Sequence, residues 1–325
     1  MTTPPSTEQR SPTTTSWVVA GLSAAFIIAW SSGFIGSRLG TQTSTTLNLL
    51  SWRLVVLCPV AVIILSVTTK PKPNTSRRMP AGWKQQVLVG LLTQVISTWG
   101  AVAAIEYGVG VGTAAVIAAL QPMITGAFAS LVLKESVKKQ EWLGLGVGLV
   151  GVALAVSGDL GAGMAPWWAY LLPFFGMLAL VAATLIEARR PSQRPIAERL
   201  SIQVLVGAIV FGAVAVFTGQ FVGPHLSESL FWMTVAWYVV FSITGGYTLY
   251  WVVLRRTSAT RVGALIYLTP PTAAVWAWLM FGDTLNGITV IGFAVVALGV
   301  GLVFLHSSRT ANTDVEQTRG KAPVG

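Results

Sequence analysis

The chain has 325 residues, of which 53% are hydrophobic and only 10% are charged, and its net charge is +10. A soluble domain carries about 25% charged residues, so this composition excludes an ordinary soluble protein and indicates a chain that faces lipid or itself. The single cysteine excludes a disulfide framework, and two histidines are too few for a histidine-built site, so we expect no metal and no cofactor.

Ten apolar stretches are long enough to cross the hydrocarbon core of a bilayer, which needs roughly 20 residues per helix. They lie at residues 17–37, 45–68, 85–106, 111–133, 142–158, 165–186, 200–222, 230–254, 262–281 and 287–306. The second contains Arg53. The first stretch follows a polar tail and precedes all the others, so we expect it to be retained and not cleaved as a signal. Residues 1–15 and 308–325 have the composition of disordered tails.

The basic residues alternate between the segments that join these spans. If the N-terminus is cytoplasmic, every Lys and Arg except Arg38 and Arg53 falls in a cytoplasmic segment or tail. Cytoplasmic loops of membrane proteins carry such an excess of positive charge. We therefore expect a multi-pass protein of the plasma (inner) membrane with both termini cytoplasmic. The positive charge sets topology and does not bind nucleic acid, so the expected partners are the lipid bilayer and a small-molecule substrate.

Shifting the sequence by 148 residues aligns two parts of the chain. Residues 120–122 (Leu-Gln-Pro) fall on residues 268–270 (Leu-Thr-Pro), and glycines of the fifth span fall on glycines of the tenth. Each copy holds five spans, and because five is odd the second copy must enter the membrane from the opposite side. We predict an all-α membrane protein with ten transmembrane helices, arranged as two inverted five-helix repeats (16–158 and 159–307) around a central cavity.

Several motifs occur in a fixed order along the chain. They are WSSGFIGSRLG at 30–40, Arg53 in LLSWRLVVL, and a Leu-x-Pro in spans four and nine, each followed by a short acidic turn, LKES (133–136) or FGDT (281–284). This order resembles the EamA-type ten-helix transporters of the drug/metabolite transporter superfamily, with one departure at Asp283, where the family usually has Glu. The resemblance implies a transporter with a central cavity between its repeats, often an exporter of amino acids or other metabolites.

Polar side chains within a span are costly unless they face other protein or water. Gln94 and Thr98 share a helix face, as do Tyr247 and Trp251, and such mixed stripes suit an amphipathic solute because rings stack while amides and hydroxyls hydrogen-bond. The expected cavity residues are Trp30, Ser32, Gln94, Thr98, Trp99, Gln121, Thr244, Tyr247, Trp251, Tyr267 and Thr269. This largely uncharged wall argues against a strongly anionic substrate such as a nucleotide-sugar. The alternative is that these groups only bond a neighbouring helix, at about 0.6 kcal/mol each.

Pro122 and Pro270 each remove a backbone hydrogen bond in mid-span, which makes them either gating hinges or static kinks. Arg53 is a structural or gating residue by the resemblance, an anion ligand, or a side chain that reaches to the headgroups. The GxxxG at 144–148 favours close helix contact, which we expect within a monomer and not in a dimer.

No Asp or Glu lies at the centre of a span, so the sequence shows no proton relay, and we expect transport to depend weakly on the pH gradient. The chain also lacks the HExxH, P-loop and Asp-rich metal motifs, so we do not expect an enzyme. The predicted function is secondary transport by alternating access, with export of amino acids or related metabolites. A drug or sugar-type carrier of the same fold, and a membrane sensor that transports nothing, are the alternatives.

Overall fold

The computed structural model describes residues 12–68, 82–133, 139–161, 165–190, 192, 194–223, 228–256, 265–283, 285–299 and 301–302. Every regular element in these residues is helical. The elements are α1 (Pro12–Thr41), α2 (Thr46–Thr68), α3 (Trp83–Gly90), η1 (Leu91–Ser97), α4 (Thr98–Glu106), α5 (Val111–Ala118), α6 (Gln121–Leu133), α7 (Lys139–Gly161), η2 (Trp167–Tyr170), α8 (Leu171–Arg189), α9 (Ile196–Phe217), α10 (Ser229–Trp237), η3 (Tyr238–Gly245), α11 (Gly246–Arg256), α13 (Thr269–Phe281) and a helix over Gly287–Gly299.

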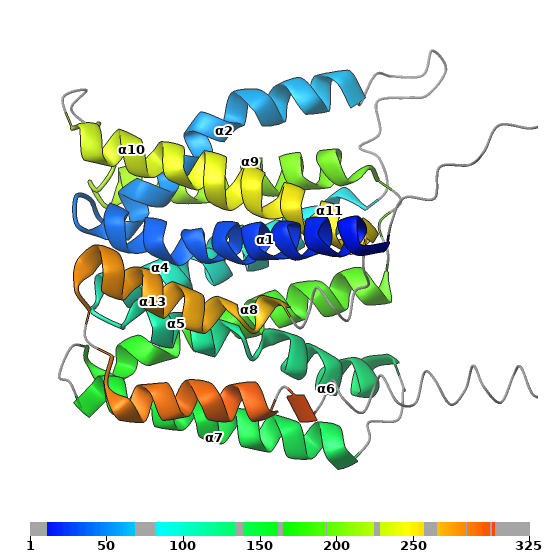
Figure 1. Cartoon of the computed structure of the whole chain (residues 1–325). Coiled ribbons are helices and arrows are strands. Elements are labelled where there is room, and N and C mark those ends of the chain that lie inside the picture. Colours follow the sequence, from blue (N-terminus) through cyan, green and yellow to red (C-terminus); the bar gives the residue numbers. More distant parts are fainter. Residues whose placement is uncertain are drawn as a thin grey trace, which may run out of the picture.

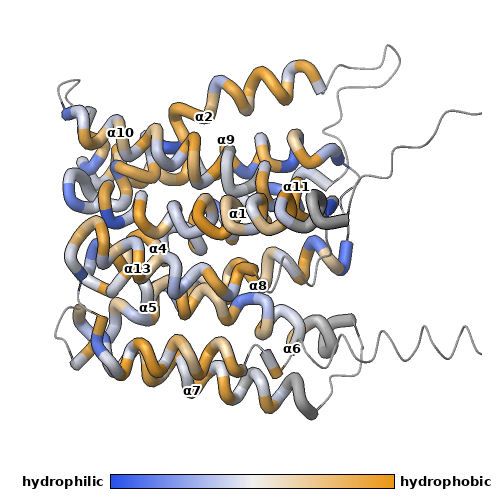
Figure 2. Tube along the Cα trace, in the orientation of Figure 1, coloured by the Kyte–Doolittle hydropathy of each residue, from blue (hydrophilic) through white to orange (hydrophobic). Residues whose placement is uncertain are grey.

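Eight helical segments of the described residues are long and apolar enough to cross a membrane, and they correspond to the first eight predicted spans. In the ninth and tenth predicted spans lie α13 and the shorter apolar helix Gly287–Gly299. Large apolar side chains cover the outside of the bundle, with Phe217 90% and Ile209 70% exposed, as lipid-facing residues are. Hydrophilic residues gather mostly at the two ends of the bundle (Figure 2). The protein is an all-α, multi-pass integral membrane protein, and the count of ten spans stays a prediction.

The long helices run roughly parallel to one direction, with α1 among the others (Figure 1). Helix α1 contacts η3, α11 and α13, α2 lies along α9, and α8 contacts η1 and α6. Helix α1 begins at the end of the bundle toward which the Gly287–Gly299 helix runs (Figure 1). We call this the tail end, and the other the opposite end. The ends of the chain's described part therefore lie on one side, as a chain with an even number of spans requires.

Two spans contain π-helical segments in place of regular α-helix. The third span changes to π-helix at η1, and the eighth changes at η3. Shifting the range of η1 by 148 residues gives 239–245, which lies within η3. At the end of η1, the hydroxyl of Thr98, the first residue of α4, donates to the carbonyl of Thr93 in η1 at 3.0 Å, five residues earlier. π-Helical turns are rare and concentrate at functional sites. The matching positions of η1 and η3 in the two halves of the chain therefore predict that the functional site lies beside these two segments.

The fourth span is broken at the Leu-Gln-Pro motif, and α13 begins at the matching Leu-Thr-Pro motif. Pro122 and Pro270 each occupy the second residue of a new helix, α6 and α13 respectively. The residue before each helix donates three residues back, from Leu120 to Ile117 at 3.2 Å and from Leu268 to Leu265 at 3.0 Å. Our expectation that each proline removes an intrahelical hydrogen bond was therefore wrong. An N–H in the first turn of a helix has no intrahelical acceptor, so a proline there removes no bond.

Helix α7 and the Gly287–Gly299 helix pack backbone against backbone. A Cβ on Gly292 would lie 2.5 Å from the amide nitrogen of Ala155 and 2.7 Å from the carbonyl oxygen of Gly151. A Cβ on Gly299 would lie 2.7 Å from the carbonyl oxygen of Gly144. Later residues of one helix meet earlier residues of the other, so the pair is antiparallel. The predicted GxxxG contact therefore falls between two helices of the same chain.

Candidate functional site

Two adjoining hollows, of about 260 and 360 Å³, lie in the middle of the bundle. Six residues line both of them: Trp30, Arg53, Ser97, Thr98, Leu180 and Ser242. The two hollows lie against the same wall residues, and we call them together the central cavity. Its walls come from α1, α2, η1, α4, α8 and η3, so spans from both halves of the chain build it.

Five of the expected cavity residues line this space. Trp30 and Thr98 line both hollows, Gln94 lines the larger one, and Gln121 and Thr269 line the smaller one. They come from five different elements (α1, α4, η1, α6 and α13), which only the folded bundle brings together. The helix breaks position two of them, since Gln121 and Thr269 are the first residues of α6 and α13.

Three other expected residues lie outside the described lining of the central cavity. Ser32 is buried, and its hydroxyl donates to the carbonyl of Ala29 in its own helix at 2.6 Å. Trp99 packs against the apolar cluster around Leu49, and Tyr267 is buried in the cluster around Leu120. The remaining expected residues, Thr244, Tyr247 and Trp251, have side chains outside the described part of the chain.

Sequence reasoning overlooked three cavity residues, Ser37, Thr93 and Tyr238. Ser37 is seven positions after Trp30, which places it on the same helix face. Tyr238 likewise precedes Ser242 by four residues. The helical spacing was therefore available as a signal, but nothing in the sequence distinguished this face from the others.

The glycines of the WSSGFIGSRLG motif let η3 come close to α1. A Cβ on Gly33 would lie 2.9 Å from the hydroxyl of Ser242, and one on Gly36 would lie 3.3 Å from the ring of Tyr238. Across this contact the hydroxyls of Ser37 and Tyr238 share a hydrogen bond of 2.6 Å. The indole of Trp237 also donates to the carbonyl of Ser32 at 3.0 Å.

Arg53 is the charged residue in the described wall of the central cavity. Its side chain is buried, with 6% of the residue exposed, and its guanidinium carbon lies 5.0 Å from the centre of the Tyr238 ring. An aromatic face at this distance attracts a cation through its quadrupole. No Asp or Glu is among the described residues that line either hollow.

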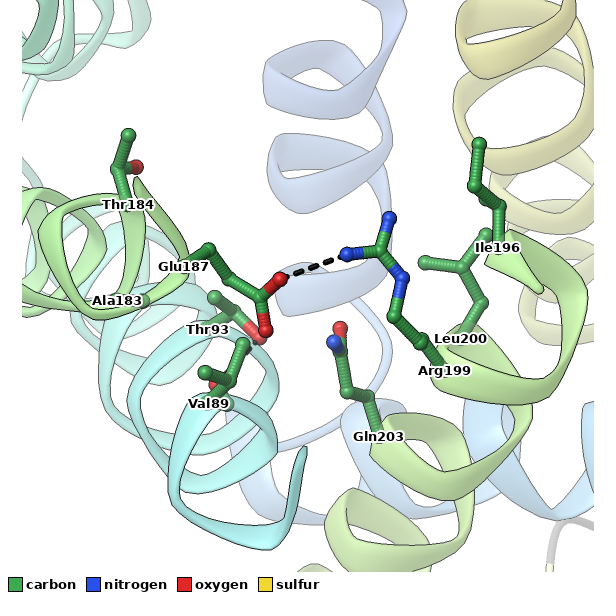
Figure 3. A pocket seen from close by; sticks show the side chains of 9 residues that line it. All are labelled: Val89, Thr93, Ala183, Thr184, Glu187, Ile196, Arg199, Leu200 and Gln203. Atoms are coloured by element: carbon green, nitrogen blue, oxygen red, sulfur yellow. Dashed lines mark hydrogen bonds and ion pairs between the residues drawn. The ribbon is translucent and has the colours of Figure 1, made fainter. Parts of the chain in front are cut away.

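A side pocket of about 290 Å³ adjoins the central cavity, and the two share the wall residues Thr93 and Leu200. At its rim the side chains of Glu187 and Arg199 point toward each other and form an ion pair at 2.6 Å (Figure 3). Glu187 also accepts from the amide of Gln86 at 2.5 Å. Glu187 lies near the last residue of α8, so the side pocket lies toward the tail end.

Other charged side chains link helices at the opposite end of the bundle. Arg38 forms an ion pair with Asp283 at 3.9 Å, which joins the end of α1 to the turn after α13. Asp159 accepts from the backbone of Gly110 and from the hydroxyl of Tyr170, each at 3.0 Å. Among the described residues, no three His, Cys, Asp or Glu side chains lie close enough together to hold a metal ion.

Residues 15–157 and residues 167–305 match the EamA-like transporter family. The chain is 24% identical to the "Uncharacterized inner membrane transporter YedA" of Escherichia coli K12 over 282 residues, 86% of this chain and 89% of that protein. It is 18% identical to a "Probable amino-acid metabolite efflux pump" of Salmonella typhimurium over 286 residues, 86% and 92% of the two chains. A solved crystal structure shares the fold, with a TM-score of 0.57 at 15% identity over 89% of this chain and 98% of the other. Together with the motifs and the helical bundle, these matches show that the chain is a membrane transporter of the EamA-like transporter family, in the drug/metabolite transporter superfamily.

Proposed function

We propose that this chain is a secondary carrier that exports a small amphipathic solute, an amino acid or a related metabolite, across the inner membrane. The observation that carries the proposal is the central cavity, whose wall combines the ring of Trp30 with the polar groups of Gln94, Thr98 and Gln121. Binding sites for small molecules are concave and mostly apolar, with a few placed polar groups. The name of the Salmonella relative supports the substrate class and the direction.

Alternating access by two inverted repeats forms the mechanistic part of the proposal. Three features recur at an offset of 148 residues: the π-helical segments, the helix starts at Gln121 and Thr269, and the hydrogen bonds that precede them. In the antiparallel helix pair, the contact of Gly144 with Gly299 becomes that of Gly292 with Gly151 under the same offset. A two-fold axis in the membrane plane would produce this exchange, which supports two repeats of inverted topology and ten spans.

The orientation in the membrane follows from charge. The start of α7 and the ends of α8 and α11, which carry Lys139, Arg189 and Arg256, belong to the tail end together with both ends of the described chain, and the positive-inside preference would make that end cytoplasmic. The side pocket adjoins the central cavity toward this end, whereas the Arg38–Asp283 ion pair lies at the other end. These features support a structure that faces the cytoplasm, with the gate on the far side closed. In this mechanism the breaks before Pro122 and Pro270 are the gating hinges.

Counterflow in proteoliposomes tests the proposal. Purified protein is reconstituted into liposomes loaded with an unlabelled amino acid, and labelled amino acids are added outside, one at a time. A carrier is expected to accumulate label transiently, because it exchanges solute without net flux, whereas a sensor of the same fold accumulates none. Protein-free liposomes provide the control. Absence of exchange across a panel of amino acids and related metabolites would contradict the proposed function.

A further inference from the structure

The side pocket is lined by one acidic and one basic side chain that lie next to each other. Glu187 on α8 and Arg199 on α9 point toward each other and form the ion pair at 2.6 Å (Figure 3). Both side chains stay accessible from outside, with 22% of Glu187 and 26% of Arg199 exposed. The charges in the described lining of the pocket therefore sum to zero. Such a lining is complementary to a solute that carries both charges, and less so to a solute that carries one.

A hydrogen-bond network holds the carboxylate of Glu187 in place. It accepts from the amide of Gln86 at 2.5 Å and from the amide of Gln85 at 3.3 Å. Gln86 is itself fixed, because it is fully buried and accepts from the amide of Gln203 at 3.0 Å. The network joins α3, α8 and α9. The acidic group is therefore preorganised, and a ligand does not have to order it on binding.

Both members of the ion pair have hydrogen-bonding capacity beyond the bonds they make. An ionised carboxylate offers about four acceptor positions, and the described residues use three of those of Glu187. Arg199 donates to Glu187 from Nη1, and its Nε is buried without an acceptor in the part of the chain that the structure describes. A carboxylate bound along the edge formed by Nε and Nη2 would satisfy this donor. An ammonium group at Glu187 and a carboxylate at Arg199 therefore fit without separation of the pair.

The rest of the pocket suits a small aliphatic body. Its volume of about 290 Å³ lies just below the range of about 300–1,000 Å³ that is typical of sites for drug-sized ligands. Its aliphatic walls come from Val89, Ala183, Ile196 and Leu200. No aromatic ring is among the described residues that line it. Because Thr93 and Leu200 also line the central cavity, a solute bound here lies beside the main site.

We propose that the side pocket is a second binding site, which takes the zwitterionic head of an amino acid, with its ammonium group on Glu187 and its carboxylate on Arg199. This rests on the proposed function and deepens it, since it requires both charges on the solute and gives the solute a site at the tail end before it reaches the central cavity. An amine or a carboxylate of the same size meets one partner and one like charge, so it binds this pocket more weakly.

Binding of labelled leucine to the purified full-length protein, measured by equilibrium dialysis in detergent, tests the proposal. The competitors are unlabelled leucine, 3-methylbutylamine and 4-methylpentanoate, which share one carbon skeleton and carry both charges, the positive charge or the negative charge. Each singly charged analogue should displace leucine from the side pocket about tenfold less well, because it loses a charge-assisted hydrogen bond.

The charged residues are then replaced one at a time. Glu187→Gln and Arg199→Gln should each remove one bound leucine per chain and, with it, the preference for leucine over the analogue that lacks the matching charge. A purely structural ion pair would lower the affinity for leucine and for both analogues alike. Unchanged leucine binding in both variants, or a loss that is equal for all three compounds, overturns the proposal.

Two further variants serve as controls. Glu198→Gln removes a buried carboxylate that pairs with Arg194 on the same helix and is absent from the described lining of the side pocket, so leucine binding should stay at the wild-type level. A loss there like that in Glu187→Gln would overturn the proposal. Ile196→Trp fills the pocket and leaves the ion pair in place, and because Ile196 is 41% exposed the larger side chain does not burden folding. It should also remove one leucine, and full binding would contradict the site.

Counterflow of labelled leucine in proteoliposomes is measured in parallel and keeps the two proposals apart. Exchange by the wild-type protein, together with unchanged leucine binding in Glu187→Gln and Arg199→Gln, refutes the side pocket and leaves the carrier function standing. Loss of a bound leucine in these variants, without exchange by the wild-type protein, refutes the carrier and leaves the binding site standing.

Discussion

Ser32 and Ser37 lie close together on α1, and the hydroxyl of each donates to a carbonyl of its own helix, Ser32 to Ala29 and Ser37 to Gly33. Such bonds are common because the short serine side chain reaches the backbone of the preceding turn. The Ser37 hydroxyl also shares a hydrogen bond with Tyr238, which lies 201 positions away in the sequence. This second bond links α1 to the tyrosine whose ring faces Arg53. The structural role of a serine in this bundle therefore depends on the side chains packed against it and not on its residue type alone.

Trp30 gives a prediction at this scale. Its ring lines the central cavity and contacts Phe26 and Tyr250, with ring centres 5.5 and 6.1 Å away. Trp30→Ala should raise the KM for an aromatic amino acid in counterflow by about ten- to one-hundredfold, because roughly 1.5–3 kcal/mol of apolar burial is lost. The KM of Trp30→Phe should lie between those of the wild-type protein and of Trp30→Ala. Phe217→Ala, on the exposed outer surface, is the control, and an unchanged KM in Trp30→Ala would contradict this placement.

At the scale of elements, spans are interrupted where they contribute to the central cavity. The π-helical segments η1 and η3 supply Gln94, Ser97, Tyr238 and Ser242 to its wall. Hydrogen bonds at such interruptions are less regular than in an uninterrupted helix, so these are the places where a span bends most easily. The binding surface and the flexible parts of the fold therefore coincide.

The prolines should affect rate more than stability. Pro122 lies in the first turn of α6, where no backbone hydrogen bond is lost, so Pro122→Ala should change the free energy of unfolding by no more than about 1 kcal/mol. It should nevertheless slow counterflow, because alanine lets α5 and α6 join into one straighter helix. The Pro270→Ala variant should behave in the same way. Wild-type exchange rates in both variants would show that the breaks are static.

The antiparallel helix pair gives a prediction about stability. A methyl group on Gly292 meets the backbone of Ala155 at 2.5 Å, whereas a methyl group on Gly146 meets nothing within 4 Å. Gly292→Ala should therefore lower the stability by about 1–3 kcal/mol, the usual cost of overpacking. Gly146→Ala, on α7, is the matched control and should be neutral or slightly stabilising. Thermal unfolding in detergent measures both, and equal midpoints would contradict the close packing.

For the molecule as a whole, charged groups are separated by position. The ion pairs of Glu187 with Arg199 and of Arg38 with Asp283 lie toward the two ends of the bundle, and the middle holds Arg53. Charges at the ends are near water and headgroups, so they cost little, while a charge in the middle must serve binding or packing. This separation leaves no carboxylate in the described wall of the central cavity that could carry a proton across with the solute.

Transport should therefore be insensitive to the proton gradient. We expect the initial rate of amino acid uptake into proteoliposomes to be the same with and without an imposed pH gradient, and a protonophore should not change it. The membrane potential is held at zero with potassium and valinomycin, so that only the proton gradient differs. Loss of uptake on adding the protonophore would mean that a carboxylate at one of the bundle ends takes part in coupling.

The sequence by itself determined the class of protein, the first eight spans, the offset of 148 residues and the family. These properties are one-dimensional, since apolar length, the order of motifs and their spacing need no knowledge of neighbours. The tertiary structure decided which face of each span meets the central cavity. It placed Trp30, Gln94 and Thr98 there, left Ser32 outside the lining, and brought the ring of Tyr238, which bonds to Ser37, to Arg53. The physical reason is that a polar side chain in a membrane helix has several ways to satisfy its hydrogen bonds, and only packing selects among them.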